Sequence, residues 1–197
     1  HTRLAAGGAE GRARLYEPAS GTLGEEFVAG GPVLSLAFTP DSTKLALGSG
    51  DKSAQIAVPA AQRSAKLHEG KIHDLAVTTN GAQFFTCGAD QVIGMWNVSN
   101  LPPVRTFEGV NQVTKRLDRS GNGQLLVTAD DKMLRLWNVN GQLQAEATTP
   151  AAIVDVAINA DGKKILVAGA DKVFRNYGLQ QVQGMNQLQL GQECGGH

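Results

Sequence analysis

The chain has 197 residues, 42% of them hydrophobic and 18% charged, so it can bury a core and does not have the composition of a disordered chain. Eighteen Lys and Arg balance eighteen Asp and Glu, and this neutral balance lacks the basic surplus of a dedicated nucleic-acid binder. Apolar runs end after about six residues, which is too short to span a bilayer. We therefore expect no nucleic-acid partner and no membrane span in this segment.

The two ends of the chain and its cysteines do not identify the cellular compartment of the protein. The chain starts at His1 without a signal-peptide pattern, which favours a segment cut from a longer protein. Cys87 and Cys194 are its two cysteines, so this is not a disulfide scaffold and the compartment stays open.

A repeat of about forty residues occupies most of the sequence. It begins as a partial unit at residues 3–28, where Tyr16 follows Glu10 by six positions. Four longer units follow, opening with the apolar stretches VLSLAF, IHDLAV, VTKRLD and IVDVAI. In each of them an acidic residue stands 18 positions after the first apolar residue, and an aromatic or small residue stands six further on. The acidic residues are Asp51, Asp90, Asp131 and Asp171, and the later positions hold Ala57, Trp96, Trp137 and Tyr177.

Each unit is typical of strands joined by hairpins. The apolar runs are separated by turn pairs, namely Asp41-Ser42, Asn80-Gly81, Gly121-Asn122 and Asp161-Gly162. Four strands in forty residues correspond to one propeller blade. VLSLAF and IVDVAI are nearly continuous apolar runs, which is expected if the first strand of a blade is buried on both faces.

We predict an all-β fold, a β-propeller of four-stranded antiparallel blades with about five blades in a partial or open ring. One continuous propeller segment spans residues 1–190, and a flexible tail follows at 191–197. The predicted blades cover residues 3–28 (partial), 33–67, 72–107, 113–148 and 153–190.

These segments resemble the WD-repeat β-propeller family, over about residues 3–180. GADQVIGMWNV, ADDKMLRLWNV and GADKVFRNYGL are similar to the family's third-strand segment, and PDSTKLALGSGD is similar to its second-strand segment. The resemblance implies a buried hydrogen-bonded network in each blade, made by a His, a Ser or Thr, an Asp and a Trp. One unit carries all four residue types, at His68, Thr86, Asp90 and Trp96.

The other units keep only parts of that network. Thr128, Asp131 and Trp137 remain in the unit at 113–148, Asp171 and Tyr177 remain in the last unit, and Asp51 remains in the unit at 33–67. Most blades are therefore degenerate members of the family.

The stretch VTKRLD is the most unusual first strand. Arg116 and Asp118 stand where the other units are expected to have apolar residues. A buried charge needs a partner, so we expect the two to pair with each other or with the next blade. The alternative is a polar patch near the central channel that receives a partner.

The residues favour a non-enzymatic protein. His68 lies near Glu69 and His73, but no further ligand cluster is evident, so we predict no metal site, cofactor or catalytic residue. The resemblance implies a protein-interaction scaffold that contacts protein partners through loops on one rim. The candidate contact residues are Lys71, Gln91, Asn111, Gln112 and Lys132.

Two alternatives remain open. One is a quinoprotein-like propeller oxidoreductase, although the Trp by which that family docks its blades is absent. The other is an accessory module appended to a kinase or cytochrome domain. The Ala- and Gln-rich units favour a bacterial origin.

Overall fold

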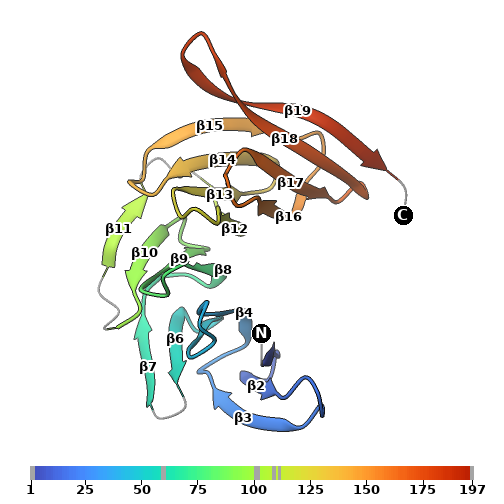
Figure 1. The fold of residues 1–197 in the computed structure, drawn as a ribbon. Helices are drawn as coiled ribbons and strands as arrows, with labels where there is room; N and C mark the ends of the chain where they lie inside the picture. The colour runs from blue at the N-terminus through green and yellow to red at the C-terminus, as the bar shows by residue number, and fades with distance from the viewer. Residues whose placement is uncertain (1–2, 59–60, 100–102, 108–109, 111, 196–197) are drawn as a thin grey trace. The chain divides into compact units, whose positions relative to one another are not determined.

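A computed structural model describes residues 3–58, 61–99, 103–107, 110 and 112–195. Nineteen strands and no helix occur among these residues, which confirms the all-β prediction. They form one three-stranded and four four-stranded antiparallel sheets, and consecutive strands are neighbours in every sheet (Figure 1). Five sheets of this kind match the five predicted blades.

The strands of the first three blades are as follows. The first blade contains β1 (Leu4–Gly7), β2 (Arg12–Tyr16) and β3 (Leu23–Val28). The second contains β4 (Val33–Phe38), β5 (Leu45–Ser49), β6 (Ser53–Val58) and β7 (Ala61–Lys66). The third contains β8 (Ile72–Val77), β9 (Gln83–Gly88), β10 (Ile93–Asn97) and β11 (Pro103–Phe107).

Two more blades complete the chain. The fourth contains β12 (Arg116–Arg119), β13 (Leu125–Ala129), β14 (Met133–Asn138) and β15 (Leu143–Thr148). The fifth contains β16 (Ile153–Ile158), β17 (Lys164–Gly169), β18 (Val173–Val182) and β19 (Met185–Gly195). The chain divides into two compact units, His1–Val104 and Arg105–His197, with the boundary inside β11. The repeat pattern did not indicate this boundary.

Asx residues fix the turns between the first and second strands of a blade. Asp41, Asn80, Asn122 and Asp161 each accept a hydrogen bond from the N–H two residues on. The residue between them has positive φ, as in Gly81 (65°) and Gly162 (78°), which is a conformation that glycine adopts without steric cost. In the fourth blade this pair is Asn122-Gly123, one residue later than the predicted Gly121-Asn122.

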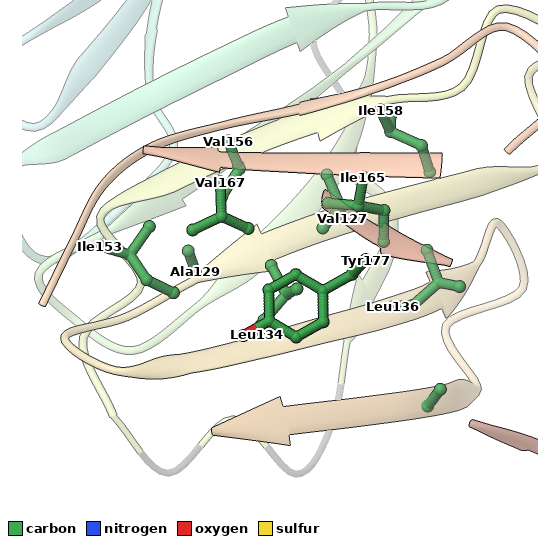
Figure 2. Close-up of a cluster of buried hydrophobic side chains, with 11 residues drawn as sticks. Val127, Ala129, Leu134, Leu136, Ile153, Val156, Ile158, Ile165, Val167 and Tyr177 are labelled. Carbon is green, nitrogen blue, oxygen red and sulfur yellow. The ribbon is translucent and has the colours of Figure 1, made fainter. Parts of the chain in front are cut away.

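Facing sides of consecutive blades make the core within each unit. In the second unit, Val127, Leu134 and Leu136 of the fourth blade pack with Ile165 and Tyr177 of the fifth (Figure 2). Equivalent clusters join the first blade to the second and the second to the third. Central strands of a blade, such as β5, in which every residue is buried, and β10, in which four of five residues are buried, are covered on both faces, whereas β4 is mostly half-buried. The expectation that first strands are the doubly buried ones is therefore wrong.

The fourth blade is shifted by one residue relative to the predicted repeat. β12 begins at Arg116 instead of Val113, and Leu117 pairs with Thr128 as Leu75 pairs with Thr86 in the third blade. The β13–β14 turn is one residue shorter than the β9–β10 turn of the third blade, and this restores the spacing of the repeat from the third strand onward. Asp130 N–H bonds Met133 O across two intervening residues, whereas Gly88 N–H bonds Val92 O across three. The later first strand and the shorter turn offset each other, so the spacing of 18 residues in the sequence does not reveal either one.

The fifth blade ends in a long hairpin. β18 and β19 pair from Val173–Gly195 to Val182–Met185, around a Gln183-Gly184 turn in which both φ angles are positive (52° and 81°). Residues 191–195, expected as a tail, continue β19 because their backbone pairs with β18.

Candidate functional site

The third blade brings its four predicted network residues together. His68 Nδ1 lies 2.9 Å from Asp90 Oδ1, and His68 Nε2 lies 2.7 Å from Thr86 Oγ1. Trp96 Nε1 donates to the same Thr86 oxygen over 2.6 Å. One proton arrangement satisfies every group: His68 Nδ1–H donates to the carboxylate, and the Thr86 hydroxyl donates to Nε2.

Backbone N–H groups complete the environment of Asp90. Glu69 N–H donates to Oδ2 over 2.8 Å and Val92 N–H donates to Oδ1 over 3.2 Å. Burial by itself would raise the pKa of Asp90, but the hydrogen bonds from His68 and these two N–H groups together hold it below its ordinary value. The His68 side chain is fully buried, so this network stabilises the blade and offers no surface to a substrate or ligand.

Gly94 makes room for the indole of Trp96. A Cβ at Gly94 would lie 2.4 Å from ring atom Cζ2 of Trp96, which is closer than carbon atoms can approach. The Trp96 ring therefore reaches Thr86 by crossing over a residue that has no side chain.

The fourth blade keeps the Thr128–Trp137 bond but not the predicted acid. Trp137 Nε1 donates to Thr128 Oγ1 over 2.9 Å. Asp131 has a 63% exposed side chain and lies 3.8 Å from Lys115 Nζ, so its predicted place in the network is wrong. The buried acid is Asp130, because the shorter turn moves the inward-facing position back by one residue.

We expect the neighbours Asp130 and Asp131 to respond differently to neutralisation. Asp130 bonds Arg135 over 2.6 Å and Met133 N–H over 3.0 Å, so Asp130→Asn should lower the free energy of unfolding by about 1–3 kcal/mol. Asp131→Asn should change it by less than about 0.5 kcal/mol, because its ion pair is exposed. Denaturant unfolding of both variants measures the contrast. If Asp131→Asn lowers the free energy of unfolding more than Asp130→Asn does, Asp131 is the network acid, as the repeat spacing predicted.

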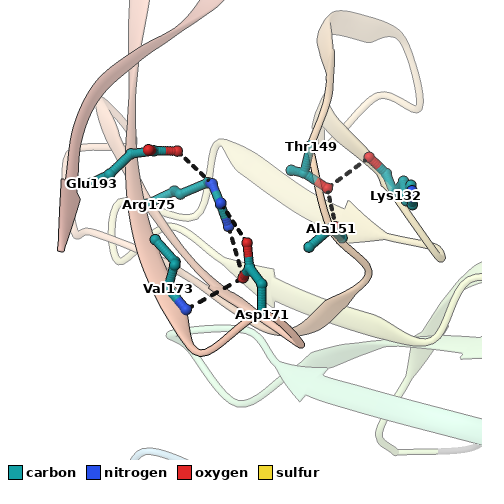
Figure 3. A network of polar contacts seen from close by, with 7 residues as sticks. All are labelled: Lys132, Thr149, Ala151, Asp171, Val173, Arg175 and Glu193. Atoms are coloured by element: carbon teal, nitrogen blue, oxygen red, sulfur yellow. Dashed lines mark hydrogen bonds and ion pairs between the residues drawn. The ribbon is translucent and has the colours of Figure 1, made fainter. Parts of the chain in front are cut away.

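In the fifth blade an arginine takes the place of the histidine (Figure 3). Arg175 donates to both carboxylate oxygens of Asp171, over 3.1 and 2.6 Å, and its Nε donates to Glu193 over 2.7 Å. These hydrogen bonds lower the pKa of Asp171. Thr149, which occupies the histidine position, instead contacts the carbonyl oxygens of Lys132 and Ala151. Tyr177 packs in the core, since Val167 stands where a partner hydroxyl would be.

This acid–arginine–glutamate arrangement occurs in three blades. Its members are Glu10, Arg14 and Glu26 in the first blade, Asp130, Arg135 and Glu146 in the fourth, and Asp171, Arg175 and Glu193 in the fifth. The three arginines lie on β2, β14 and β18, and each glutamate lies opposite its arginine, on β3, β15 and β19. We did not predict this set. Its signal in the sequence is an arginine four or five residues after the acidic turn residue.

The second blade has neither arrangement. Asp51 accepts bonds from the N–H and hydroxyl of Ser53, over 3.0 and 2.6 Å. Gln55 occupies the arginine position, and its buried Oε1 has no hydrogen-bond partner.

Arg116 and Asp118 both interact with the following blade. Leu117, not Arg116, occupies the position equivalent to Leu75, so these charges do not replace the buried apolar residues as we had expected. Arg116 Nε lies 3.7 Å from Asp155 Oδ1, and Asp118 Oδ2 accepts the Ile158 N–H over 2.9 Å. Burial raises the pKa of Asp118. The expected pairing with the next blade is what the contacts show.

Four of the five predicted rim residues lie in described loops, and all four are exposed. Lys71 and Gln91 are exposed, and Lys71 O accepts the Ala89 N–H over 2.8 Å, which ties the loop before β8 to the β9–β10 turn. In the other unit Gln112 and Lys132 are exposed, and Lys132 O accepts the Thr149 N–H over 2.8 Å. Asn111 lies outside the described residues.

The described residues contain neither a metal site nor a membrane-spanning helix. No group of three His, Cys, Asp or Glu side chains there is arranged to hold a metal ion. No helix in that part of the chain has the length and apolar character needed to cross a bilayer. Cys87, which is buried, and Cys194, which is exposed, are not joined in a disulfide.

Comparison with a family model identifies the repeats. The model described as "WD domain, G-beta repeat" matches residues 22–56, 62–97 and 101–138. Each match starts in the fourth-strand region of one blade and ends in the third strand of the next, so the sequence repeat and the blade are offset by one strand. The fifth blade forms although its own repeat lies outside these matches.

Curated relatives share parts of the chain. They include transcription initiation factor TFIID subunit 5 of Caenorhabditis elegans (25% identical, 70% of this chain and 22% of the relative). Apoptotic protease-activating factor 1 of Rattus norvegicus is 28% identical over 55% of this chain and 10% of its own length. Eukaryotic translation initiation factor 3 subunit I of Schizosaccharomyces pombe is 30% identical over 55% of this chain and 36% of its own length. These relatives are eukaryotic and do not support the bacterial origin we expected.

A solved structure shares the fold. A chain in the crystal structure of the mitotic checkpoint complex superposes with a TM-score of 0.86, at 18% identity, over all of this chain and 62% of its own length. The match supports the propeller fold. The chain spans at most about a third of the three curated relatives' lengths and 62% of the solved chain, and the interpretation as a segment of a larger propeller stays a prediction.

Proposed function

Because the chain belongs to the WD40-repeat family, we propose that it is a non-catalytic protein-interaction platform. The observation that carries the proposal is the contrast between a fixed backbone and exposed side chains at one end of the blades. Loop residues on a rigid scaffold are where binding residues concentrate in proteins.

The loops before the first strand and after the second strand provide that rigidity. In three blades a backbone hydrogen bond of 2.8 Å joins them, from Gly50 to Pro32, from Ala89 to Lys71 and from Ala170 to Ala152. Side chains such as Lys71 and Gln91 extend from these loops without partners in the core. Such side chains can vary without disturbing the strands, which suits recognition of a protein surface.

The named relatives support a protein partner. Two of them are subunits by name, of TFIID and of initiation factor 3, and the structural relative is part of a checkpoint complex. The buried His68 network provides no reacting group at the surface, and no observation favours the oxidoreductase alternative. A role as an accessory module in a longer chain remains compatible with this proposal.

We expect charge reversal on the rim to remove binding without loss of fold. Proteins captured from an extract of the source organism by the immobilised chain would be identified by mass spectrometry, and the captured partner would be purified. Lys71→Glu and Lys132→Glu would then be measured against it separately, since they lie in different units. At least one should weaken the Kd by about tenfold or more, with an unchanged melting temperature.

Lys163→Glu is the matched control. Lys163 is also exposed but lies in the β16–β17 turn, at the opposite end of its blade. If Lys163→Glu weakens binding as much as the rim variants do, or if binding is lost only when the variants unfold, the rim is not the contact surface.

A further inference from the structure

Three turns of the chain share one backbone geometry and contain an Asn-Gly pair. Asn80-Gly81, Asn122-Gly123 and Asn140-Gly141 are the three Asn-Gly pairs in the sequence. In each turn the glycine has a positive φ (65°, 71° and 81°), and its N–H bonds the carbonyl oxygen three residues earlier, over 2.8, 2.9 and 3.0 Å. The asparagine is exposed in all three turns. Backbone shape and exposure therefore do not distinguish the three pairs.

In the first two turns the asparagine side chain is held in place. Asn80 Oδ1 accepts the Thr78 hydroxyl over 2.8 Å and the N–H two residues further on over 3.1 Å. Asn122 Oδ1 accepts the Ser120 hydroxyl over 2.6 Å and, likewise, the N–H two residues further on over 3.0 Å. Asn122 Nδ2 also donates to Asp161 O over 3.3 Å. Both side chains are thus fixed by hydrogen bonds that their own turns supply.

In the β14–β15 turn another residue makes these bonds. Asn138 stands where the other two turns have Thr78 and Ser120, and its Oδ1 accepts the N–H groups of Asn140 and Gln142, each over 3.0 Å. The Gln142 N–H is the group equivalent to those that bond Asn80 and Asn122 in the other turns. The Asn140 side chain makes no hydrogen bond with the part of the chain that the structure describes, so it is free to rotate.

We propose that Asn140 is a modification site at which the chain deamidates spontaneously, and that the other two Asn-Gly pairs are protected by their turns. The Gly141 nitrogen attacks Cγ of Asn140, the Cγ–Nδ2 bond breaks, and ammonia leaves with the proton from that nitrogen. Water then opens either C–N bond of the resulting cyclic imide and leaves aspartate or isoaspartate. Glycine favours this attack because it has no Cβ to crowd the nitrogen.

The modification changes both the charge and the backbone of the turn. It adds one carboxylate to a turn in which Asn140 O already accepts a hydrogen bond from Arg105 Nη1 over 3.1 Å. Isoaspartate also adds a methylene group to the main chain, which shifts the groups that Asn138 holds. The turn joins the third and fourth strands of its blade, at the opposite end from the rim loops, so the modification does not depend on the proposed contact surface.

Peptide mapping of the folded 197-residue chain after incubation at mildly alkaline pH tests the proposal. Trypsin places the three pairs in separate peptides, 72–105, 120–132 and 136–163, and fragment spectra assign the modified residue. Asn140 should react about tenfold faster or more than Asn80 or Asn122. Those residues must first break two hydrogen bonds to Oδ1, each of which corresponds to about a factor of two to ten.

The same chain in denaturant is the first control. All three asparagines are followed by glycine, so their rates should converge once the hydrogen bonds of the turns are lost. Asn140→Gln is the second control, because the longer side chain closes a larger and slower-forming ring. The acidic species that the wild type gains on ion-exchange chromatography should not accumulate in that variant.

Asn138→Ser tests the cause of the difference. It gives the β14–β15 turn the hydroxyl that Ser120 supplies in the fourth blade's other Asn-Gly turn, so Asn140 should react several-fold more slowly. If this variant fails to fold by circular dichroism, the comparison of folded and denatured wild type decides. Equal rates at Asn140 and Asn80 in the folded chain, or a folded Asn138→Ser variant with an unchanged rate at Asn140, would overturn the proposal.

Discussion

Replacing Arg135 with methionine is expected to lower the free energy of unfolding of the second unit by about 3–5 kcal/mol. The Asp130 side chain is 2% exposed and Arg135 is its charged partner, at 2.6 Å. Methionine keeps an unbranched apolar stem in the site while it removes the guanidinium. The loss therefore measures the cost of a buried carboxylate without its counter-ion. The contact with Glu146 adds little, because that carboxylate is 53% exposed.

Two features of the chain make this measurement specific. Trp96 and Trp137 are its two tryptophans, one in each unit, so Trp137 fluorescence in a Trp96→Phe background reports denaturant unfolding of the second unit. The double variant Asp130→Asn/Arg135→Met removes both charges and should be more stable than Arg135→Met alone. If the double variant is less stable than Arg135→Met, the loss reflects packing and the ion-pair interpretation fails.

Replacing His68 with alanine is expected to lower the free energy of unfolding of the first unit by about 1–3 kcal/mol. The change leaves the Thr86 hydroxyl and the Asp90 carboxylate without their shared partner and removes the edge contact between the rings of His68 and Trp96, whose centroids are 6.0 Å apart. Trp96 fluorescence in a Trp137→Phe background reports the transition. Glu69→Gln is the adjacent control, because its 81% exposed side chain should contribute almost nothing. A neutral result for His68→Ala would contradict the network.

The dependence on pH has a definite sign. The folded-state pKa of Asp90 is lowered, so its ionised form contributes stability that is fully present above its unfolded pKa, near 3.9. That contribution is lost as the pH falls through the lower folded-state pKa. The stability difference between the wild type and Asp90→Asn should therefore be constant between about pH 5 and 7 and should narrow below about pH 4. If the stability difference widens as the pH falls, the prediction that Asp90 is ionised in the folded protein is wrong.

The repeat predicted the blades well because strand pairing follows from local patterns. Apolar runs of five or six residues between Asx turns favour short hairpins, and the five predicted groups form five sheets. The His68 network was also predictable, since all four of its residue types stand at the spacing of the family. Asp131 was misassigned for a physical reason. A longer first loop and a shorter second turn cancel in the residue count, and only the pairing of Leu117 with Thr128 separates them.

The sequence by itself determined the all-β repeat, the family resemblance, the neutral charge and one complete buried network. Tertiary structure decided which acid each arginine meets, because partners such as Arg175 and Glu193 are 18 residues apart, and the pairing of Arg135 with Asp130 depends on the length of a single turn. It also decided which apolar residues are buried. Leu166 and Val127 are alike in sequence pattern, and they differ because Val127 has a following blade packed against it. Whether a side chain is buried depends on the residues that pack against it, and the repeat pattern alone does not say which residues those are.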